Sequence, residues 1–217
     1  MRILAAADIH GSLEVYQWLI EQTPLADVLV LAGDLFDADF EDQQRLQAQK
    51  ILKILPRSNC PVFYIMGNDD NVPLDCNDGL ITPLHGCRAE FDGYNFVGYQ
   101  YTPPFAGETF VKEDSEIAAD LDLLDGGAVD EGTIFVTHTP AYGRLDLCNE
   151  EHVGSRALAD FLRRNPVMAH IHGHIHHAFG VDDYHFNVAS AAQCRAMLID
   201  LPSLTYKVLD RSSGLAP

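Results

Sequence analysis

Short apolar runs recur along the chain and predict an alternation of strands and helices. The runs are rich in branched and large aliphatic residues, as expected of strands buried on both faces. They are Ile3 to Ala7, Val28 to Ala32, Val62 to Met66, Phe96 to Tyr99, Ile134 to Thr137 and Met168 to Ile171. Segments of helical character separate the first three, at Leu13 to Glu21 and at Asp42 to Leu55, which Pro56 ends. This order predicts a parallel sheet covered by helices.

The second half of the chain is predicted to add two helices and a final run of strands. Val111 to Leu124 has helical character up to Gly126 and Gly127, and Ser155 is a candidate N-cap of a helix that reaches Arg164. The final strands are expected at His185 to Ala189, Arg195 to Leu201 and Tyr206 to Leu209. No repeat or interdomain linker interrupts the pattern, so we expect residues 1–217 to form a single α/β domain.

Side chains that commonly bind metals follow the carboxyl ends of five predicted strands. They are Asp8 and His10, Asp34, Asn68, His138, and the histidines His172, His174 and His176. Strand ends of an open α/β sheet share one edge, where ligands bind. Imidazole combined with carboxylate or amide oxygen suits Mn, Fe, Zn, Co or Ni, whereas Mg and Ca prefer more oxygen ligands. The sequence therefore predicts a site for more than one transition-metal ion.

Glycines accompany several of these residues, and the histidine-rich stretch alternates along the chain. We expect Gly33, Gly67 and Gly173 to let the backbone turn tightly, so that the next side chain points into the site. If the strand ran straight, period-two alternation would direct all the even-numbered histidines from position 170 to 176 toward one side.

Five ordered motifs resemble those of the calcineurin-like metallophosphoesterase family. They are Asp8-Ile9-His10, Gly33-Asp34-Leu35-Phe36-Asp37, Gly67-Asn68-Asp69-Asp70, His138 and Gly173-His174-Ile175-His176, and they span most of the chain. The resemblance implies a four-layer αββα sandwich, with two central mixed β-sheets flanked by helices. It also implies that Asp8, His10 and His176 hold one ion, that Asn68, His138 and His174 hold a second, and that Asp34 bridges both.

The implied activity is hydrolysis of a small phosphodiester or phosphomonoester. Two ions about 3.5 to 4 Å apart lower the pKa of a shared water and neutralise charge on phosphoryl oxygens, so a metal-bound hydroxide would attack phosphorus without a covalent intermediate. One position departs from the family pattern, because Asp69 stands where most members carry a histidine that protonates the leaving group. Nearby cations favour an ionised carboxylate, a poor acid. We therefore expect phosphodiesters or aryl phosphates to be preferred over alkyl monoesters.

Three further residues are candidates for support of the site or for contact with substrate. Asp37 is expected to support a ligand indirectly or to cap a helix. Arg144 either binds a substrate phosphate through its planar guanidinium or is a solvated loop residue. His172 either orients a ligand or contacts substrate, or is an ordinary residue at a strand end, while Asn68 is expected to contact substrate as well as metal.

The remaining aromatic candidates have plainer alternatives. Tyr99, Tyr101 and Phe105 lie near two prolines and could wall a pocket for an aromatic leaving group, but packing in the core is favoured. His85 and His152 are isolated in loop-like surroundings, and we expect them to be surface or turn residues.

Composition and charge restrict the partners. A content of 47% hydrophobic and 21% charged residues is ordinary for a globular protein. The formal net charge of −18, from 14 Lys and Arg against 32 Asp and Glu, would repel a long nucleic acid. A nuclease on DNA or RNA is therefore the less favoured enzyme. A non-catalytic metal-binding scaffold is the alternative of another class, but every expected ligand is present.

Cysteines and apolar segments indicate the compartment. The five cysteines, Cys60, Cys76, Cys87, Cys148 and Cys194, are odd in number and form no closely spaced pair, so reduced thiols are expected. No apolar stretch approaches the roughly 20 residues of a membrane-spanning helix, and the N-terminal run lacks the features of a secretory signal. We therefore expect a cytoplasmic protein without membrane contact, while the sequence leaves its substrate, native metals and oligomeric state open.

Overall fold

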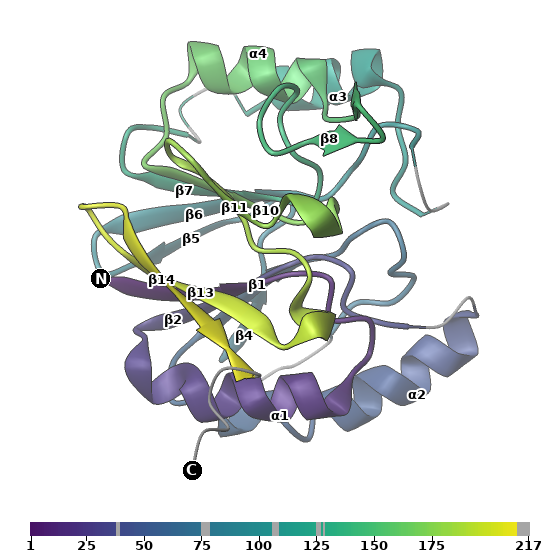
Figure 1. The fold of residues 1–217 in the computed structure, drawn as a ribbon, viewed down its shortest axis with the longest axis vertical. Coiled ribbons are helices and arrows are strands. Elements are labelled where there is room, and N and C mark those ends of the chain that lie inside the picture. The colour runs from purple at the N-terminus through teal and green to yellow at the C-terminus, as the bar shows by residue number, and fades with distance from the viewer. Residues whose placement is uncertain (38–39, 75–78, 106–108, 125–126, 128, 212–217) are drawn as a thin grey trace.

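A computed structural model describes residues 1–37, 40–74, 79–105, 109–124, 127 and 129–211 of the chain (Figure 1). Two residues considered above, Cys76 and Gly126, lie outside these ranges. Cys60, Cys87, Cys148 and Cys194 are free thiols. Within the described residues, no helix has the length and apolar character needed to cross a membrane.

Two six-stranded mixed sheets pack face to face in the middle of the molecule (Figure 1). The first sheet has the order β14 (Thr205–Asp210), β13 (Arg195–Asp200), β1 (Arg2–Ala6), β2 (Val28–Ala32), β3 (Val62–Ile65) and β4 (Ile81–Pro83). The second has the order β11 (Gly180–Asp182), β12 (His185–Asn187), β10 (Ala169–His172), β7 (Thr133–Thr137), β6 (Tyr94–Tyr99) and β5 (Arg88–Phe91).

Helices cover the outer face of each sheet, which completes four layers. The first sheet carries α1 (Leu13–Gln22) and α2 (Glu41–Ile51), and the second carries α3 (Asp114–Asp122) and α4 (Arg156–Arg164) (Figure 1). Smaller elements are the hairpin of β8 (Leu147–Cys148) and β9 (Glu151–His152), and the 3-10 turns η1 (Thr23–Leu25), η2 (Leu55–Arg57), η3 (His176–Ala178) and η4 (Ala191–Gln193). The predicted αββα sandwich is confirmed.

Alternation along the central strands explains the layering. In β1, Leu4 and Ala6 face the core beneath α1 and α2, whereas Ile3 and Ala5 face the core between the sheets. Because both faces of such a strand are buried, its sequence is a continuous apolar run. A third core cluster lies between the second sheet and the helices α3 and α4.

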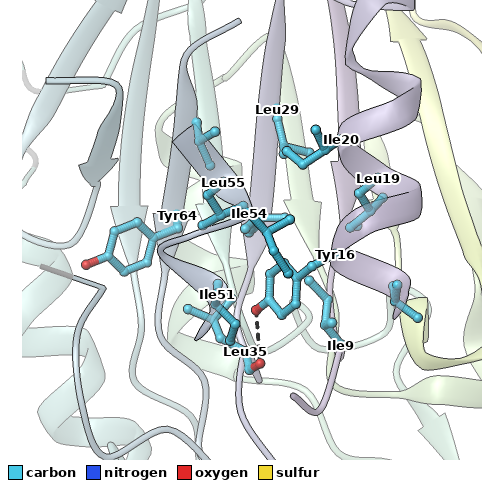
Figure 2. Close-up of a cluster of buried hydrophobic side chains, with 14 of the residues drawn as sticks. Ile9, Tyr16, Leu19, Ile20, Leu29, Leu35, Ile51, Ile54, Leu55 and Tyr64 are labelled. Carbon is cyan, nitrogen blue, oxygen red and sulfur yellow. Dashed lines mark hydrogen bonds between the residues drawn. The ribbon is translucent and has the colours of Figure 1, made fainter. Parts of the chain in front are cut away.

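The core beneath α1 also supports the loop that follows β2. The Tyr16 ring lies fully buried among Ile9, Leu19 and Ile51, and its hydroxyl donates a hydrogen bond to the Leu35 carbonyl at 2.9 Å (Figure 2). Leu35 directly follows the predicted ligand Asp34, so packing in this core fixes the backbone of the site.

Two predicted helices differ from the observed ones at their ends. The helix expected to reach Leu55 ends at Ile51, and Pro56 lies inside the 3-10 turn η2 instead of ending a helix. The helix expected from Val111 begins at Asp114, since Glu113 and Glu116 form a capping box there. The predicted N-cap Ser155 is confirmed, because its side chain accepts a hydrogen bond from Leu158 N at 3.0 Å.

The strand directions bring the predicted ligands toward one edge. β1, β2 and β3 are mutually parallel, as are β7 and β10 in the second sheet. The segments after β1 and β2 continue side by side, with hydrogen bonds from Asp8 N to Gly33 O at 2.9 Å and from Ile9 N to Asp34 O at 2.9 Å. The loops that carry the candidate ligands are therefore extensions of the sheets.

Candidate metal centre

Six of the seven predicted metal ligands form one continuous cluster. Their donor atoms fall into three groups, and within each group all atoms lie within 4.8 Å of one another. The first group is Asp8, His10 and His176, and the second is Asp34, His138 and His174. The third is His10, Asp34 and Asp69. His10 and Asp34 each belong to two groups, so the groups merge. The arrangement offers imidazole and carboxylate donors to two neighbouring ions.

Left-handed backbone conformations occur at four of the seven predicted ligands. The φ angles are 56° at Asp8, 48° at His10, 50° at Asp34 and 70° at His174. A residue with a side chain adopts this region at a cost of roughly 1–2 kcal/mol, and such residues concentrate at functional sites. The strands β1, β2 and β10 are therefore each followed by a turn that hydrogen bonds to neighbouring loops hold in place, and the sequence did not predict these conformations.

Asn68, the seventh predicted ligand, lies beside this cluster. Its Nδ2 donates to Asp69 Oδ1 at 2.9 Å, and the next backbone N–H, that of Asp69, donates to Asp34 Oδ1 at 3.0 Å. Among the described residues, the buried Asn68 Oδ1 has no hydrogen-bond partner, and the buried His138 Nε2 has only its 3.3 Å approach to Asp34 Oδ2. A buried polar atom without a partner is costly, so the Asn68 oxygen beside these carboxylates fits the binding of a cation.

His138 and Asp34 are a buried pair of opposite charges. His138 Nε2 lies 3.3 Å from Asp34 Oδ2, and Nδ1 lies 2.8 Å from the Ala32 carbonyl oxygen, to which it donates. Burial acts to lower the pKa of His138, but Asp34 raises it to about 10. Burial likewise acts to raise the pKa of Asp34, but His138 lowers it. Because Nδ1 keeps its hydrogen, a cation would bind at Nε2 after that atom loses its proton.

The pKa values of the two histidines of the last motif are shifted in opposite directions. His176 Nε2 lies 3.0 Å from Asp8 Oδ1, and this hydrogen bond raises the pKa of His176. Burial and the neighbouring His138 lower the pKa of His174 to about 4, so its ring is neutral at neutral pH. Asp8 also accepts from the backbone N–H of His174, at 3.1 Å, which fixes the turn after β10.

Asp70 has a structural role that sequence reasoning did not assign. Its buried carboxylate accepts hydrogen bonds from the backbone N–H groups of Leu35 at 2.8 Å, Phe36 at 3.0 Å and Gly67 at 2.8 Å. Burial and the charge of Asp34 raise the pKa of Asp70 to about 8. The carboxylate joins the loops after β2 and β3, and the only signal in the sequence was its place in the Gly67-Asn68-Asp69-Asp70 motif.

Neighbouring groups approach the motif glycines so closely that a side chain would collide with them. Gly33 has a φ of 92°, as expected of a tight turn. Gly67 and Gly173 are not in the left-handed region, and at these two positions close approach of neighbouring groups excludes a side chain. A Cβ at Gly67 would lie 2.2 Å from Asp34 Oδ1, and one at Gly173 would lie 2.4 Å from Asp8 Oδ2. Both glycines thus leave space for carboxylates of the cluster.

The histidine-rich stretch does not continue as a straight strand. β10 ends at His172, the chain turns through His174, and His176 begins η3. The rings of His170 and His172 stack inside the protein with their centroids 4.9 Å apart. Burial and, to a smaller extent, the charge of His185 lower the pKa of His172 to about 3. The His172 side chain is fully buried, which leaves a substrate no direct access to it.

Arg144 fits the alternative of a solvated loop residue, whereas neither expected role of Asp37 is seen among the described residues. Arg144 Nη1 pairs with Asp182 Oδ2 at 2.9 Å, and Arg144 lines a pocket with Tyr184 and His185 to which none of the predicted metal ligands contributes. For Asp37, the described residues show no hydrogen bond to the carboxylate, and its backbone pairs with the Gln47 side chain instead. The N-cap position of α2 belongs to Phe40.

The aromatic candidates separate into core and site residues. Tyr99 is buried and donates its hydroxyl hydrogen to Asp120 at 2.8 Å, as core packing predicts. Tyr101 lies under the Lys112 ammonium, 4.0 Å from the ring centroid. The prediction of core packing is wrong for Phe105, which is 47% exposed and meets the His174 ring edge-on, with the ring centroids 5.7 Å apart. Phe105 is therefore a wall of the candidate metal centre.

Comparisons with known proteins agree with this fold. The sequence profile of the calcineurin-like phosphoesterase family matches residues 1–178. The UPF0046 protein K07C11.7 of Caenorhabditis elegans is 30% identical over 214 residues, which cover 89% of this chain and 70% of that protein. The structure of TT1561 of Thermus thermophilus matches with a TM-score of 0.76 at 17% identity, over 96% of this chain and 98% of the other. A dimetal phosphatase from Danio rerio, LOC 393393, matches with a TM-score of 0.56 at 12% identity, over 97% and 98%.

Proposed function

The chain belongs to the calcineurin-like phosphoesterase family, and from this premise we propose that it hydrolyses small phosphate esters with two divalent transition-metal ions. Phosphodiesters are the favoured substrates, ahead of alkyl phosphomonoesters. The observation that carries the proposal is the cluster in which Asp34 belongs to two groups of potential metal ligands at once. A carboxylate shared in this way is the expected bridge between two ions.

One proposed ligand set, Asp8, His10 and His176, is itself a group of neighbouring donor atoms. The other joins His138 and His174, which are grouped with Asp34, to Asn68, whose Oδ1 is buried. Asp34 would hold both ions, as the family resemblance implies. When bound, two such ions lower the pKa of a shared water and neutralise charge on the phosphoryl group. Imidazole nitrogens with few carboxylates favour Mn, Fe, Zn, Co or Ni over Mg or Ca.

Preference for diesters rests on Asp69 and on charge. Burial and the charge of Asp34 raise the pKa of Asp69, but a bound cation would act in the opposite direction and keep its carboxylate ionised. An ionised Asp69 has no proton to give to a departing alkoxide, which penalises alkyl monoesters most. A diester also carries less negative charge than a monoester, so the net charge of −18 repels it less.

A metal-reconstituted activity screen tests the proposal. The purified protein is depleted of metal, loaded with Mn, Fe, Zn, Co or Ni in turn, and assayed on phosphomonoesters, cyclic and linear diesters, and short nucleic acids. Asp34→Asn serves as the blank, and Asp160→Asn, which changes an exposed carboxylate paired with Arg163, serves as the matched control. We expect hydrolysis of small diesters that is lost in Asp34→Asn and kept in Asp160→Asn. Absence of metal binding, or activity that survives Asp34→Asn, would contradict the proposal.

A further inference from the structure

A pocket of about 380 Å³ adjoins the candidate metal centre. Its lining includes Pro103, Pro104, Phe105, Tyr142, His152 and Arg156. Two links connect it to the cluster: the Phe105 ring meets that of His174 at 5.7 Å, and Tyr142 follows the predicted ligand His138 by four residues. A group attached to a phosphate at the centre could therefore extend into this pocket.

His152 is held in the pocket by a buried carboxylate. Asp146 is fully buried, and its Oδ1 lies 2.6 Å from His152 Nδ1. Its Oδ2 accepts from the backbone N–H groups of Gly143 at 2.9 Å and Gly154 at 3.0 Å. Since an ionised carboxylate only accepts hydrogen bonds, Nδ1 donates and Nε2 is the second polar atom of a fixed ring. No hydrogen bond within the described residues uses this Nε2, and the His152 side chain is 43% exposed.

Arg156 adds a cation to the same wall. Its guanidinium carbon lies 3.6 Å from the centroid of the Tyr142 ring, and that ring contacts His152 at 5.2 Å. No carboxylate among the described residues pairs with Arg156. Of the two acidic residues of the lining, Asp114 accepts from Ser155 Oγ and Ala157 N, and Glu113 is the N-cap residue of α3. Because the neutral imidazole of His152 already donates from Nδ1, its Nε2 is an acceptor. The pocket therefore combines apolar and aromatic walls with one cationic donor, Arg156, and one hydrogen-bond acceptor, His152 Nε2.

We propose that this pocket receives the leaving group of the substrate as a planar aromatic ring that carries both a hydrogen-bond acceptor, for Arg156, and a hydrogen-bond donor, for His152 Nε2, with these two residues determining specificity. The inference rests on the proposed function. In the hydrolysis, water forms the new bond to phosphorus and releases a proton to solvent, while the bond from phosphorus to the aryl oxygen breaks and that oxygen keeps the electron pair. An aryl oxyanion leaves without prior protonation, which suits a site with Asp69 in place of a proton donor.

Two test phosphodiesters whose leaving groups have the same acidity are compared, so that any difference in rate reports recognition of the ring and not the intrinsic ease with which the leaving group departs. One is the methyl phosphodiester of a phenol with a carboxamide substituent, which offers both an acceptor and a donor, and the other is that of a fluorinated aliphatic alcohol of similar acidity. We expect the metal-loaded protein to prefer the aryl ester. Arg156→Gln and His152→Ala should each reduce this preference about tenfold, mainly through KM, because each removes a contact of the size of a cation–π or hydrogen-bond interaction. Hydrolysis of the aliphatic ester should change little.

The matched control is Arg163→Gln, an arginine on the same helix that lies outside this pocket. A second readout is equilibrium binding, by calorimetry, of two compounds that cannot be hydrolysed, 4-carbamoylbenzylphosphonate and butylphosphonate. Tighter binding of the carbamoylbenzyl compound should disappear in Arg156→Gln and persist in Arg163→Gln. If both esters are hydrolysed but the pocket variants alter neither their ratio nor the phosphonate preference, the pocket proposal is wrong. If neither ester is hydrolysed by metal-loaded protein, the proposed function itself fails.

Discussion

Replacing Gly173 with alanine should displace a carboxylate of the candidate metal centre. The added methyl would lie 2.4 Å from Asp8 Oδ2 and 2.5 Å from the Ala7 Cβ, and contacts below 3.0 Å are essentially never seen for real Cβ atoms. Ala7 is fully buried between the sheets, so it cannot retreat without disturbing that core. The Asp8 contact must therefore open from 2.4 Å to at least 3.0 Å, which strains its hydrogen bond with the His174 backbone. Overpacking of this kind costs about 1–3 kcal/mol, and we expect about 2 kcal/mol.

Urea unfolding and metal analysis test this prediction together. The free energy of unfolding of the metal-free variant should fall by that amount, and the reconstituted variant should lose the ion assigned to Asp8, His10 and His176. The control is Gly132→Ala, because a Cβ there would meet only Asp130 Oδ1, at an ordinary 3.4 Å. Full metal content and unchanged stability in Gly173→Ala would refute the reasoning that this glycine provides space for a carboxylate.

Three further predictions concern the same loops. The metal-free protein should lose stability as pH rises from about 6.5 towards 10, because Asp34 raises the pKa of His138 from its ordinary 6.5 to about 10. The stabilisation from this pair is complete below pH 6.5 and lost above pH 10. Urea unfolding across this range would show the loss, and a free energy of unfolding that does not change with pH would contradict the prediction. Asp70→Ala leaves three buried backbone N–H groups without their acceptor and should cost about 3 kcal/mol in the same assay, whereas a loss below about 1 kcal/mol would argue against this role. Asp69→His should raise the rate on alkyl monoesters relative to diesters by about tenfold or more, since a positioned acid contributes about 10²- to 10⁴-fold, and an unchanged ratio of kcat/KM values would exclude Asp69 from leaving-group departure.

The central strands were predictable because both of their faces are buried. Ile3 to Ala7 and Val28 to Ala32 are uniformly apolar, as the two cores on either side of them require. The strands β4, β5 and β11 were missed, since each is a short strand at the edge of a sheet with half-exposed side chains. Such strands are held by backbone pairing with a neighbour, which leaves little mark on the sequence.

The identities of the site residues were more predictable than their conformations. Ordered motifs at strand ends indicated which side chains gather, but nothing local indicated left-handed φ at Asp8 or His174, because hydrogen bonds from distant loops impose it. The roles of Phe105 and His152 were also hidden. Each depends on a partner that sequence spacing does not reveal, His174 for the first and the buried Asp146 for the second.

The electrostatics of the cluster connect stability of the fold to metal binding. The buried carboxylates of Asp8 and Asp34 are each paired with a histidine whose pKa is raised, His176 and His138 respectively. A divalent ion that takes the place of those protons neutralises the same carboxylates, so binding should release protons and grow stronger as pH rises. Asp34→Asn removes the partner of His138 in both the metal-free and the metal-bound protein. A loss of activity in that variant therefore has to be compared with any change in its free energy of unfolding. His174, with its pKa lowered to about 4, has no proton to release when an ion binds at neutral pH.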